Sequence, residues 1–305
     1  MKLSAIRSSV VSVILFASIL FLASPPAEAA STARFKLLHD VFVVIPVYVN
    51  GTGPFDFLLD TGTNTSIVDP ELARALSLKP VDRLLVTTPN DTTTVVPRAW
   101  LDRVAIGGKS VDHLEIVITD LKNIREVAPR ARGVVGQNFL RSFNYLLDYQ
   151  HHRIDFDDAG EIEQKLKGNR IPIQDEEGKS LIKASQGLKK GDHGDNYWQF
   201  VLDSGASTLI VLNVNRRDLS IEANSFGSDF GLLSSGIRTC VAETTVLRFL
   251  QIGDQNLARL PVILAEAGDG YRNQAENGLI PTSLFHSIYF NNTRGYVILN
   301  PVVER

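Results

Sequence analysis

The chain has 305 residues and a formal net charge of −3, and 44% of its residues are hydrophobic. This balance gives no electrostatic footprint for nucleic acid, and we expect no nucleic-acid partner. Cys240 is the only cysteine, so no intrachain disulfide can form and a hydrophobic core must stabilise the fold.

The N-terminal 30 residues have the order of a secretory signal peptide. Lys2 and Arg7 precede an apolar run over residues 10–23, and a small-x-small site follows at residues 27–29. The run is shorter than the roughly 18 residues that a bilayer span needs, although an uncleaved N-terminal anchor is the alternative. We predict a signal peptide over residues 1–30 and an exported protein, periplasmic or secreted, that leaves the membrane after cleavage.

The rest of the chain predicts a mainly β protein. β-branched and aromatic residues dominate, in short runs separated by turn residues. Residues 41–60 predict a hairpin around Asn50-Gly51, and a short arm over residues 30–39 is expected to pair as an edge strand. The clearest helix signal is at residues 69–76, where Asp69 is a predicted N-cap and Pro70 takes the first helical position.

Two stretches of the chain repeat each other. The run "FDFLLDTGTNTSIVDP" (55–70) is matched by "YWQFVLDSGASTLIVLN" (197–213), and residues 133–157 can be laid against residues 278–301. Both pairs occur in the same order at nearly the same separation, which indicates a duplication. We therefore predict two similar lobes, over residues 31–165 and 166–305.

Each acid-turn motif ends an apolar strand on an aspartate, Asp60 or Asp203. Taken singly, such a residue usually caps a turn. Two similar lobes tend to be related by a pseudo-two-fold axis, which brings equivalent positions together. Two adjacent acids cannot both ionise cheaply, so the pair would share a proton and could activate a water by general acid–base catalysis.

The sequences "LLDTGTNTSIVD" and "VLDSGASTLIVL" resemble the active-site loops of aspartic proteases. Residues 133–136 (Gly-Val-Val-Gly) are similar to that family's second signature, and the helix-like residues after the first motif resemble bacterial, retropepsin-like members. The resemblance covers essentially the whole mature chain. It implies two β-barrel lobes with an active-site cleft between them, and an aspartic endopeptidase that acts on peptides or proteins as a monomer.

The resemblance also implies roles for individual residues. Asp60 and Asp203 match the catalytic pair. The hydroxyls of Thr61 and Ser204 match those that hold the two loops in register. Gly62 and Gly205 match the glycines that allow backbone amides to approach the carboxylates. The hydroxyl of Thr63 could reach the outer oxygen of Asp60. The second lobe has Ala206 where the first has Thr63.

One departure from the family pattern and two alternatives remain. Pro281 stands where the family usually has glycine, and proline lacks an N–H, so the loop of Asp203 is expected to be braced differently. A protease-like protein that binds peptides without cutting them is the main alternative, and a chain that needs a second copy to form its sites is another.

Other kinds of catalytic site have little support in the sequence. There is no G-x-S-x-G motif and no H-E-x-x-H motif, and His151 and His152 are adjacent in a polar turn. We expect no metal and no cofactor. Residues 84–106 are the candidate for a flap hairpin over the site, and Trp100 within them is expected to pack on a sheet.

Overall fold

The computed structural model describes residues 31–87, 93–176, 178–185, 197–213, 219–222, 242–265 and 275–303. The predicted signal peptide, residues 1–30, lies outside these ranges. Among the described residues, no helix has the length and apolar character needed to cross a membrane.

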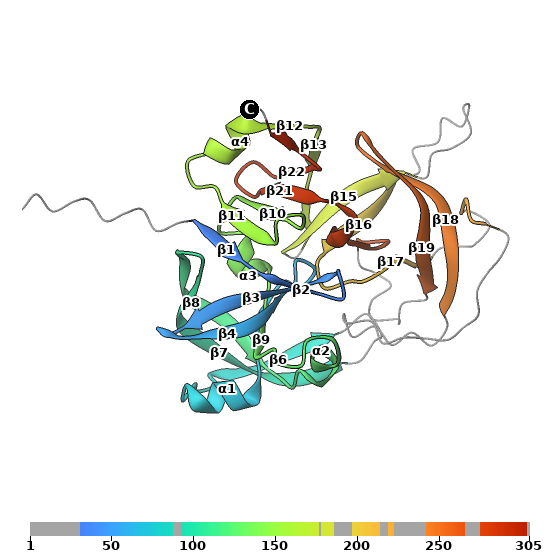
Figure 1. Cartoon of the computed structure of the whole chain (residues 1–305). Coiled ribbons are helices and arrows are strands. Elements are labelled where there is room, and N and C mark those ends of the chain that lie inside the picture. Colours follow the sequence, from blue (N-terminus) through green and yellow to red (C-terminus); the bar gives the residue numbers. More distant parts are fainter. Residues whose placement is uncertain are drawn as a thin grey trace, which may run out of the picture.

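The first half of the chain forms an eight-stranded sheet (Figure 1). Its strands, in spatial order, are β2 (Lys36–Leu38), β3 (Phe42–Val49), β4 (Thr52–Leu59), β9 (Gly133–Val135), β5 (Ser66–Val68), β8 (Lys109–Ile118), β7 (Thr93–Ile106) and β6 (Asp82–Thr87). Strand β3 also pairs with β7, which closes the sheet on itself as a barrel. The hairpin predicted around Asn50-Gly51 is confirmed, and both residues have the positive φ that such a tight turn requires, 49° and 77°.

The second half forms a seven-stranded sheet with a matching arrangement. Its strands, in spatial order, are β14 (Gln174–Glu176), β15 (Lys179–Ser185), β16 (Tyr197–Asp203), β20 (Gly278–Pro281), β17 (Leu209–Leu212), β19 (Gln255–Ala265) and β18 (Ala242–Ile252). The order β3-β4-β9-β5-β8-β7 of the first lobe therefore recurs as β15-β16-β20-β17-β19-β18. The two parallel pairs recur as well. The pair β4–β9 of the first lobe corresponds to β16–β20 of the second, and β5–β8 corresponds to β17–β19. The predicted mainly β fold with two similar lobes is thus confirmed.

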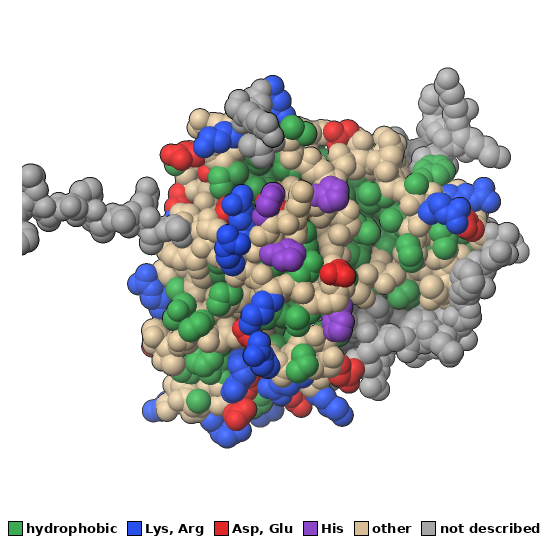
Figure 2. Space-filling model, in the orientation of Figure 1, with side chains coloured by type: hydrophobic (Ala, Val, Ile, Leu, Met, Phe, Trp, Pro, Cys, Tyr) green, Lys and Arg blue, Asp and Glu red, His purple; other side chains and the backbone are tan. Residues whose placement is uncertain are grey.

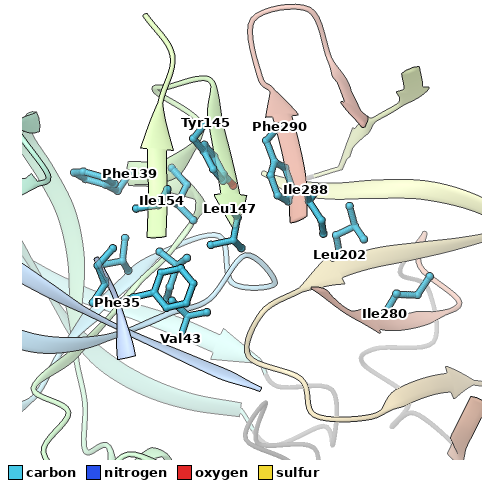
Figure 3. Close-up of a cluster of buried hydrophobic side chains, with 14 of the residues drawn as sticks. Phe35, Val43, Phe139, Tyr145, Leu147, Ile154, Leu202, Ile280, Ile288 and Phe290 are labelled. Atoms are coloured by element: carbon cyan, nitrogen blue, oxygen red, sulfur yellow. The ribbon is translucent and has the colours of Figure 1, made fainter. Parts of the chain in front are cut away.

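A third, six-stranded sheet takes strands from both halves of the chain. In spatial order it contains β1 (Thr32–Arg34), β11 (Arg153–Phe156), β10 (Tyr145–Asp148), β21 (Ser287–Asn291), β22 (Tyr296–Leu299) and β13 (Arg170–Pro172). The two halves meet where β10 pairs with β21. Here Tyr145 stacks on Phe290 at 4.7 Å between ring centroids, and both side chains are completely buried. Figure 3 shows this pair within a continuous apolar cluster that also includes Leu202 and Ile280 of the second lobe.

The helices are all short: α1 (Pro70–Ala75), α2 (Lys122–Val127), α3 (Gln137–Leu140), α4 (Glu161–Lys165) and the 3-10 turn η3 (Thr282–Leu284). Asp69 caps α1 as predicted, since its Oδ1 accepts hydrogen bonds from the amides of Glu71 and Leu72 at 2.8 and 2.9 Å. The predicted lobe boundary, residue 165/166, falls between α4 and β12 (Leu166–Lys167), which pairs with β23 (Val302–Val303). The boundary itself stays a prediction.

The predicted edge arm pairs as expected, and the candidate flap residues form a hairpin, although their role as a flap stays a prediction. β1 and β2 pair at the edges of two sheets, with β11 and β3 respectively. β6 and β7 form an antiparallel hairpin whose tip, residues 88–92, lies outside the described residues. Trp100 stacks on His113 of the neighbouring strand at 4.3 Å, so it packs on the sheet as expected.

The surface carries mixed charge. On the face drawn in Figure 2, acidic side chains are interspersed with Lys and Arg, and several histidines gather near the middle. Ion pairs such as Lys36 with Asp56 and Lys109 with Asp158 join opposite charges.

Candidate active site

The two aspartates sit at matching ends of matching strands. β4 ends at Leu59, directly before Asp60, and β16 ends at Asp203 itself. Each of these strands is paired in parallel with the short strand of the second repeated signature, β9 or β20. The amide of Asp60 donates to the carbonyl of Val135 at 3.0 Å, which fixes where the first loop leaves its sheet.

The side chains of Asp60 and Asp203 hydrogen-bond to each other across the lobe boundary. A carbon atom placed as Cβ on Gly205 would lie 2.8 Å from Oδ2 of Asp60 and 3.1 Å from Oδ1 of Asp203. Both carboxyl groups therefore border the same point in space. Asp203 is 3% exposed, whereas Asp60 is half-buried and remains in contact with solvent.

Burial and mutual repulsion keep this pair protonated beyond the usual range of an aspartate. Burial first, and then the charge of Asp60, raise the pKa of Asp203 well above its ordinary value, against the opposing effect of the Gly205 and Ala206 amides. Burial also raises the pKa of Asp60, while hydrogen bonds from the Gly62 amide, from Asp203 and from the Thr63 amide act in the opposite direction. The hydrogen bond between the two acids lowers the pKa of Asp60 and raises that of Asp203, so it favours the charged form of Asp60 and the protonated form of Asp203.

Thr61 and Ser204 link the two loops. The Thr61 hydroxyl donates to the carbonyl of Leu202 at 2.6 Å, and the Ser204 hydroxyl donates to the carbonyl of Leu59 at 2.7 Å. Each hydroxyl also accepts a hydrogen bond from the amide of the other residue, at 3.0 Å in both cases. Both side chains are essentially inaccessible to solvent. The hydrogen bonds expected from the sequence are thus present, and they tie the ends of β4 and β16 together.

The two glycines are required by the opposite carboxylates. A Cβ on Gly62 would lie 2.5 Å from Cγ of Asp203, much closer than any nonbonded carbon contact allows. The amides of Gly62 and Gly205 donate to the Oδ1 atoms of their own aspartates at 2.8 and 2.7 Å. The absence of a side chain therefore lets each loop present its amide to one acid while it contacts the other.

One expectation about Thr63 was wrong. Its hydroxyl donates to the carbonyl of Thr65 at 3.4 Å, and its amide is the group that reaches Asp60 Oδ1, at 3.1 Å. The loop turns so tightly that the amide points at the carboxylate while the side-chain hydroxyl points forward along the chain, to Thr65. Since the Ala206 amide serves Asp203 in the same way, the presence of a side-chain hydroxyl does not distinguish the two acids.

The region behind the first loop contains residues that the sequence alone did not single out. Ser66 Oγ accepts a hydrogen bond from the Gly136 amide at 3.0 Å and donates to Asn138 Oδ1 at 2.7 Å. The side chain of Gln137 donates to the carbonyl of Thr61 at 2.8 Å. The only sequence signals for them were that Ser66 lies within the repeated stretch 55–70 and that Gln137 and Asn138 follow the Gly-Val-Val-Gly signature.

Pro281 in the second lobe is matched by a change in its neighbour. In the first lobe Ile67 pairs with Val134, and in the second Ile210 pairs with Leu279. Counting along the strands from these pairs, Leu209 takes the place of Ser66. Pro281 takes the place of Gly136. Where the first lobe has an amide and its hydroxyl acceptor, the second has a proline without an N–H and a leucine without a hydroxyl. The replacement therefore leaves no polar group unpaired at this position.

No group of three or more potential metal ligands occurs among the described residues. His151 Nδ1 lies 2.7 Å from Asp148 Oδ2, in the turn after β10. The polar groups of the candidate site are thus the two carboxyls, the hydroxyls and the backbone amides.

Comparisons with known proteins found similarities in sequence and in fold. The model of the family described as "Aspartyl protease" matches residues 45–139, about a third of the chain, which includes Asp60 and the Gly-Val-Val-Gly signature. The solved structure of basic 7S globulin from soybean is similar over 88% of this chain and 95% of its own, with 12% sequence identity and a TM-score of 0.50. A retropepsin-like aspartic protease from Rickettsia conorii is 17% identical over 41% of this chain and 87% of its own, with a TM-score of 0.29. No curated protein sequence matches the chain.

The family model thus matches most of the first lobe, and the soybean structure has a similar fold over most of the chain. Both statements concern sequence and fold; the roles of Asp60 and Asp203 are proposals.

Proposed function

We propose that the protein is an aspartic endopeptidase in which Asp60 and Asp203 activate a water for attack on a peptide bond. The observation that carries the proposal is the contact between the two carboxyl groups at the ends of equivalent strands. A pair that shares one proton contains a base and an acid at the same time, which amide hydrolysis needs.

The geometry suggests a division of roles between the two acids. Asp60 is more exposed and accepts amide hydrogen bonds from Gly62 and Thr63, so it is the better proton acceptor. Asp203 is buried and carries the proton. In the proposed first step, Asp60 removes a proton from the water, the water oxygen bonds to the carbonyl carbon, and Asp203 protonates the carbonyl oxygen. The resulting diol then breaks its C–N bond as a proton passes to the leaving nitrogen.

The supporting residues preorganise this arrangement. The four hydrogen bonds of Thr61 and Ser204 hold the two strand ends in fixed register, and the site needs no reorganisation when charge moves between the acids. Because both motifs belong to one chain, we propose that the protein acts as a monomer on peptide or protein substrates. We further propose that it is exported, from the pattern of residues 1–30.

The alternative, a protein that binds peptides without cutting them, rested on Pro281. The matched Leu209 removes that argument, because the loop behind Asp203 loses a donor and its acceptor together. Both acids, both following hydroxyls and both glycines are retained.

The test compares peptide cleavage by the wild type with that by Asp60→Asn and Asp203→Asn. Each amide has nearly the size of the acid but cannot exchange the proton, so we expect loss of cleavage with a folded protein. A statine-like inhibitor, which places a hydroxyl where the attacking water would lie, should block the wild type. Unchanged cleavage in either variant would exclude the mechanism.

A further inference from the structure

The two active-site loops are braced by different means. Behind the first loop, the amides of Gln137 and Asn138 donate to the carbonyls of Thr63 and Asn64 at 2.9 and 3.2 Å, in addition to the contacts of Ser66 and the Gln137 side chain. No hydrogen bond joins residues 206–208 to residues 281–284, all of which the structure describes. The loop that carries Asp203 therefore lacks the direct tie that the loop of Asp60 has.

A tyrosine from the first half of the chain reaches this region. The hydroxyl of Tyr149 and the hydroxyl of Thr282 are 2.5 Å apart, and their exposures are 7% and 0%. Thr282 directly follows Pro281, and Pro281 is the residue that pairs with Asp203 between β20 and β16. A single buried hydrogen bond thus joins the first half of the chain to the strand end beside the second acid.

Tyr149 is itself held from both sides. Its amide donates to the carbonyl of His286 at 2.9 Å, and its ring packs edge-on against Phe35 with centroids 6.1 Å apart. It is the first residue after β10, and the first residue after the equivalent strand β21, Asn292, crosses in the opposite direction. The Asn292 amide group donates to the carbonyls of Leu140 and Phe143, at the end of α3. Each half of the chain therefore braces the other behind its active-site loop.

We infer that Tyr149 is a positioning residue for Asp203: through the hydroxyl of Thr282 it fixes the end of β20 and so holds the second acid against the first. This inference rests on the proposed function. Tyr149 touches neither a substrate nor the reacting carboxyls, and it replaces the bracing that the Pro281 position does not supply.

Electrostatics agrees with the proximity of these groups. The charge of Asp203 contributes to a raised pKa of Tyr149, after the larger effect of burial, so the hydroxyl remains neutral and can donate or accept. Asp60, in the loop after β4, is the titratable group whose charge raises the pKa of Asp203, and the charge of Asp203 in turn acts on Tyr149, in the turn after β10. Without the Tyr149 hydroxyl, Asp203 would be held less tightly against Asp60 and would be better hydrated. Both changes weaken the two causes of its raised pKa, so that pKa should fall.

The experiment uses the full chain with Tyr149→Phe, Thr282→Val and the double variant. We expect each single variant to lower kcat about tenfold with KM within about twofold of the wild type, because the loss affects alignment rather than substrate binding. The alkaline limb of the kcat/KM profile should move to lower pH by about half a unit or more. The kcat of the double variant should be no lower than that of either single variant, because an apolar pair leaves no buried hydroxyl unpaired.

Tyr145→Phe provides the matched control. Tyr145 is completely buried in the strand before Tyr149, and its hydroxyl has no hydrogen-bond partner among the described residues. Removing that hydroxyl should change neither the rate nor the pH profile. A Tyr149→Phe enzyme that loses thermal stability but keeps the wild-type kcat and pH profile would overturn the inference, since a purely structural brace predicts that result. If Tyr149→Phe does not fold, Thr282→Val supplies the same readouts.

A second readout separates this inference from the proposed function. The titration of the Asp203 carboxyl is followed by ¹³C NMR, with the signal assigned by its loss in Asp203→Asn. The midpoint should be lower in Tyr149→Phe than in the wild type and unchanged in Tyr145→Phe. If the wild type cleaves no peptide, the proposed function fails; the inference about Tyr149 then stands if the midpoint falls and fails if it does not.

Discussion

Thr61 and Ser204 each donate a hydroxyl proton to the strand that precedes the other and accept the amide proton of the other, although 143 residues separate them. These four bonds are buried, and they join the two halves of the chain at the point where both carboxyl groups lie.

Thr61→Val should therefore weaken both the fold and the catalysis. The substitution keeps the shape of the side chain but leaves the Ser204 amide and the Leu202 carbonyl without their partner, at about 1–3 kcal/mol for each unpaired group. We expect a lower melting temperature and a lower rate. Thr61→Ser retains the hydroxyl and should behave much more like the wild type. Wild-type stability and rate in Thr61→Val would show that the junction does not depend on this hydroxyl.

The raised pKa of Asp203 predicts how stability changes with pH. A carboxyl whose pKa is raised by folding keeps a proton that the unfolded chain releases, so the free energy of unfolding falls as pH rises from about 4 through the folded-state pKa. Asp203→Asn cannot titrate and should remove this decline. We expect the variant to melt at a higher temperature than the wild type near pH 7 and at a similar temperature near pH 3. Parallel curves over the whole range would contradict the raised pKa.

Thr63→Ala tests the correction made at that residue. The Thr63 amide, not its hydroxyl, donates to Asp60, so the alanine variant should retain the hydrogen bond and the low-pH limb of the activity profile. The measurement is kcat/KM against pH on one peptide. A low-pH limb that moves toward higher pH would show that the hydroxyl stabilises the charged form of Asp60 after all.

Gly62→Ala should abolish activity through a direct clash. The new methyl group would lie 2.5 Å from Cγ of Asp203, so one of the two loops must move away. Gly51→Ala is a useful contrast, because its methyl group would have no atom within 4 Å but its φ of 77° is unfavourable for alanine. We expect Gly51→Ala to cost about 1 kcal/mol of stability and to leave cleavage unchanged. Cleavage by Gly62→Ala at the wild-type rate would mean that the acids need not touch.

Local patterns predicted the parts of the structure that depend on local chemistry. Asn50-Gly51 defines a turn by its backbone preference, and Asp69-Pro70 defines the start of α1 by its capping oxygen and fixed φ. The repeated acid-turn motif also predicted that Asp60 and Asp203 occupy equivalent strand ends. In the first two cases the signal lies within a few residues, and in the third it comes from the repeat of a short motif.

Contacts between distant residues were harder to predict. The direction of the Thr63 side chain depends on the tightness of the loop, and the match of Pro281 with Leu209 appears only when the strand pairing is known. Tyr149 carries no motif at all, because its partner Thr282 is 133 residues away in the chain. Such pairs are determined by how the two lobes pack against each other, and no local pattern in a single sequence predicts that packing.

The six-stranded sheet belongs to neither half of the chain. A protein cut near residue 165 would yield two fragments, one ending its share of the sheet at β10 and the other at β21. Each fragment would then expose an unpaired strand with apolar side chains, a template for another chain. The nearest available substitute for the missing half is a second copy of the same fragment, which carries an equivalent strand. Separately produced halves should therefore self-associate. When the two halves are mixed, each exposed strand should pair either with a second copy of its own fragment or with the other half.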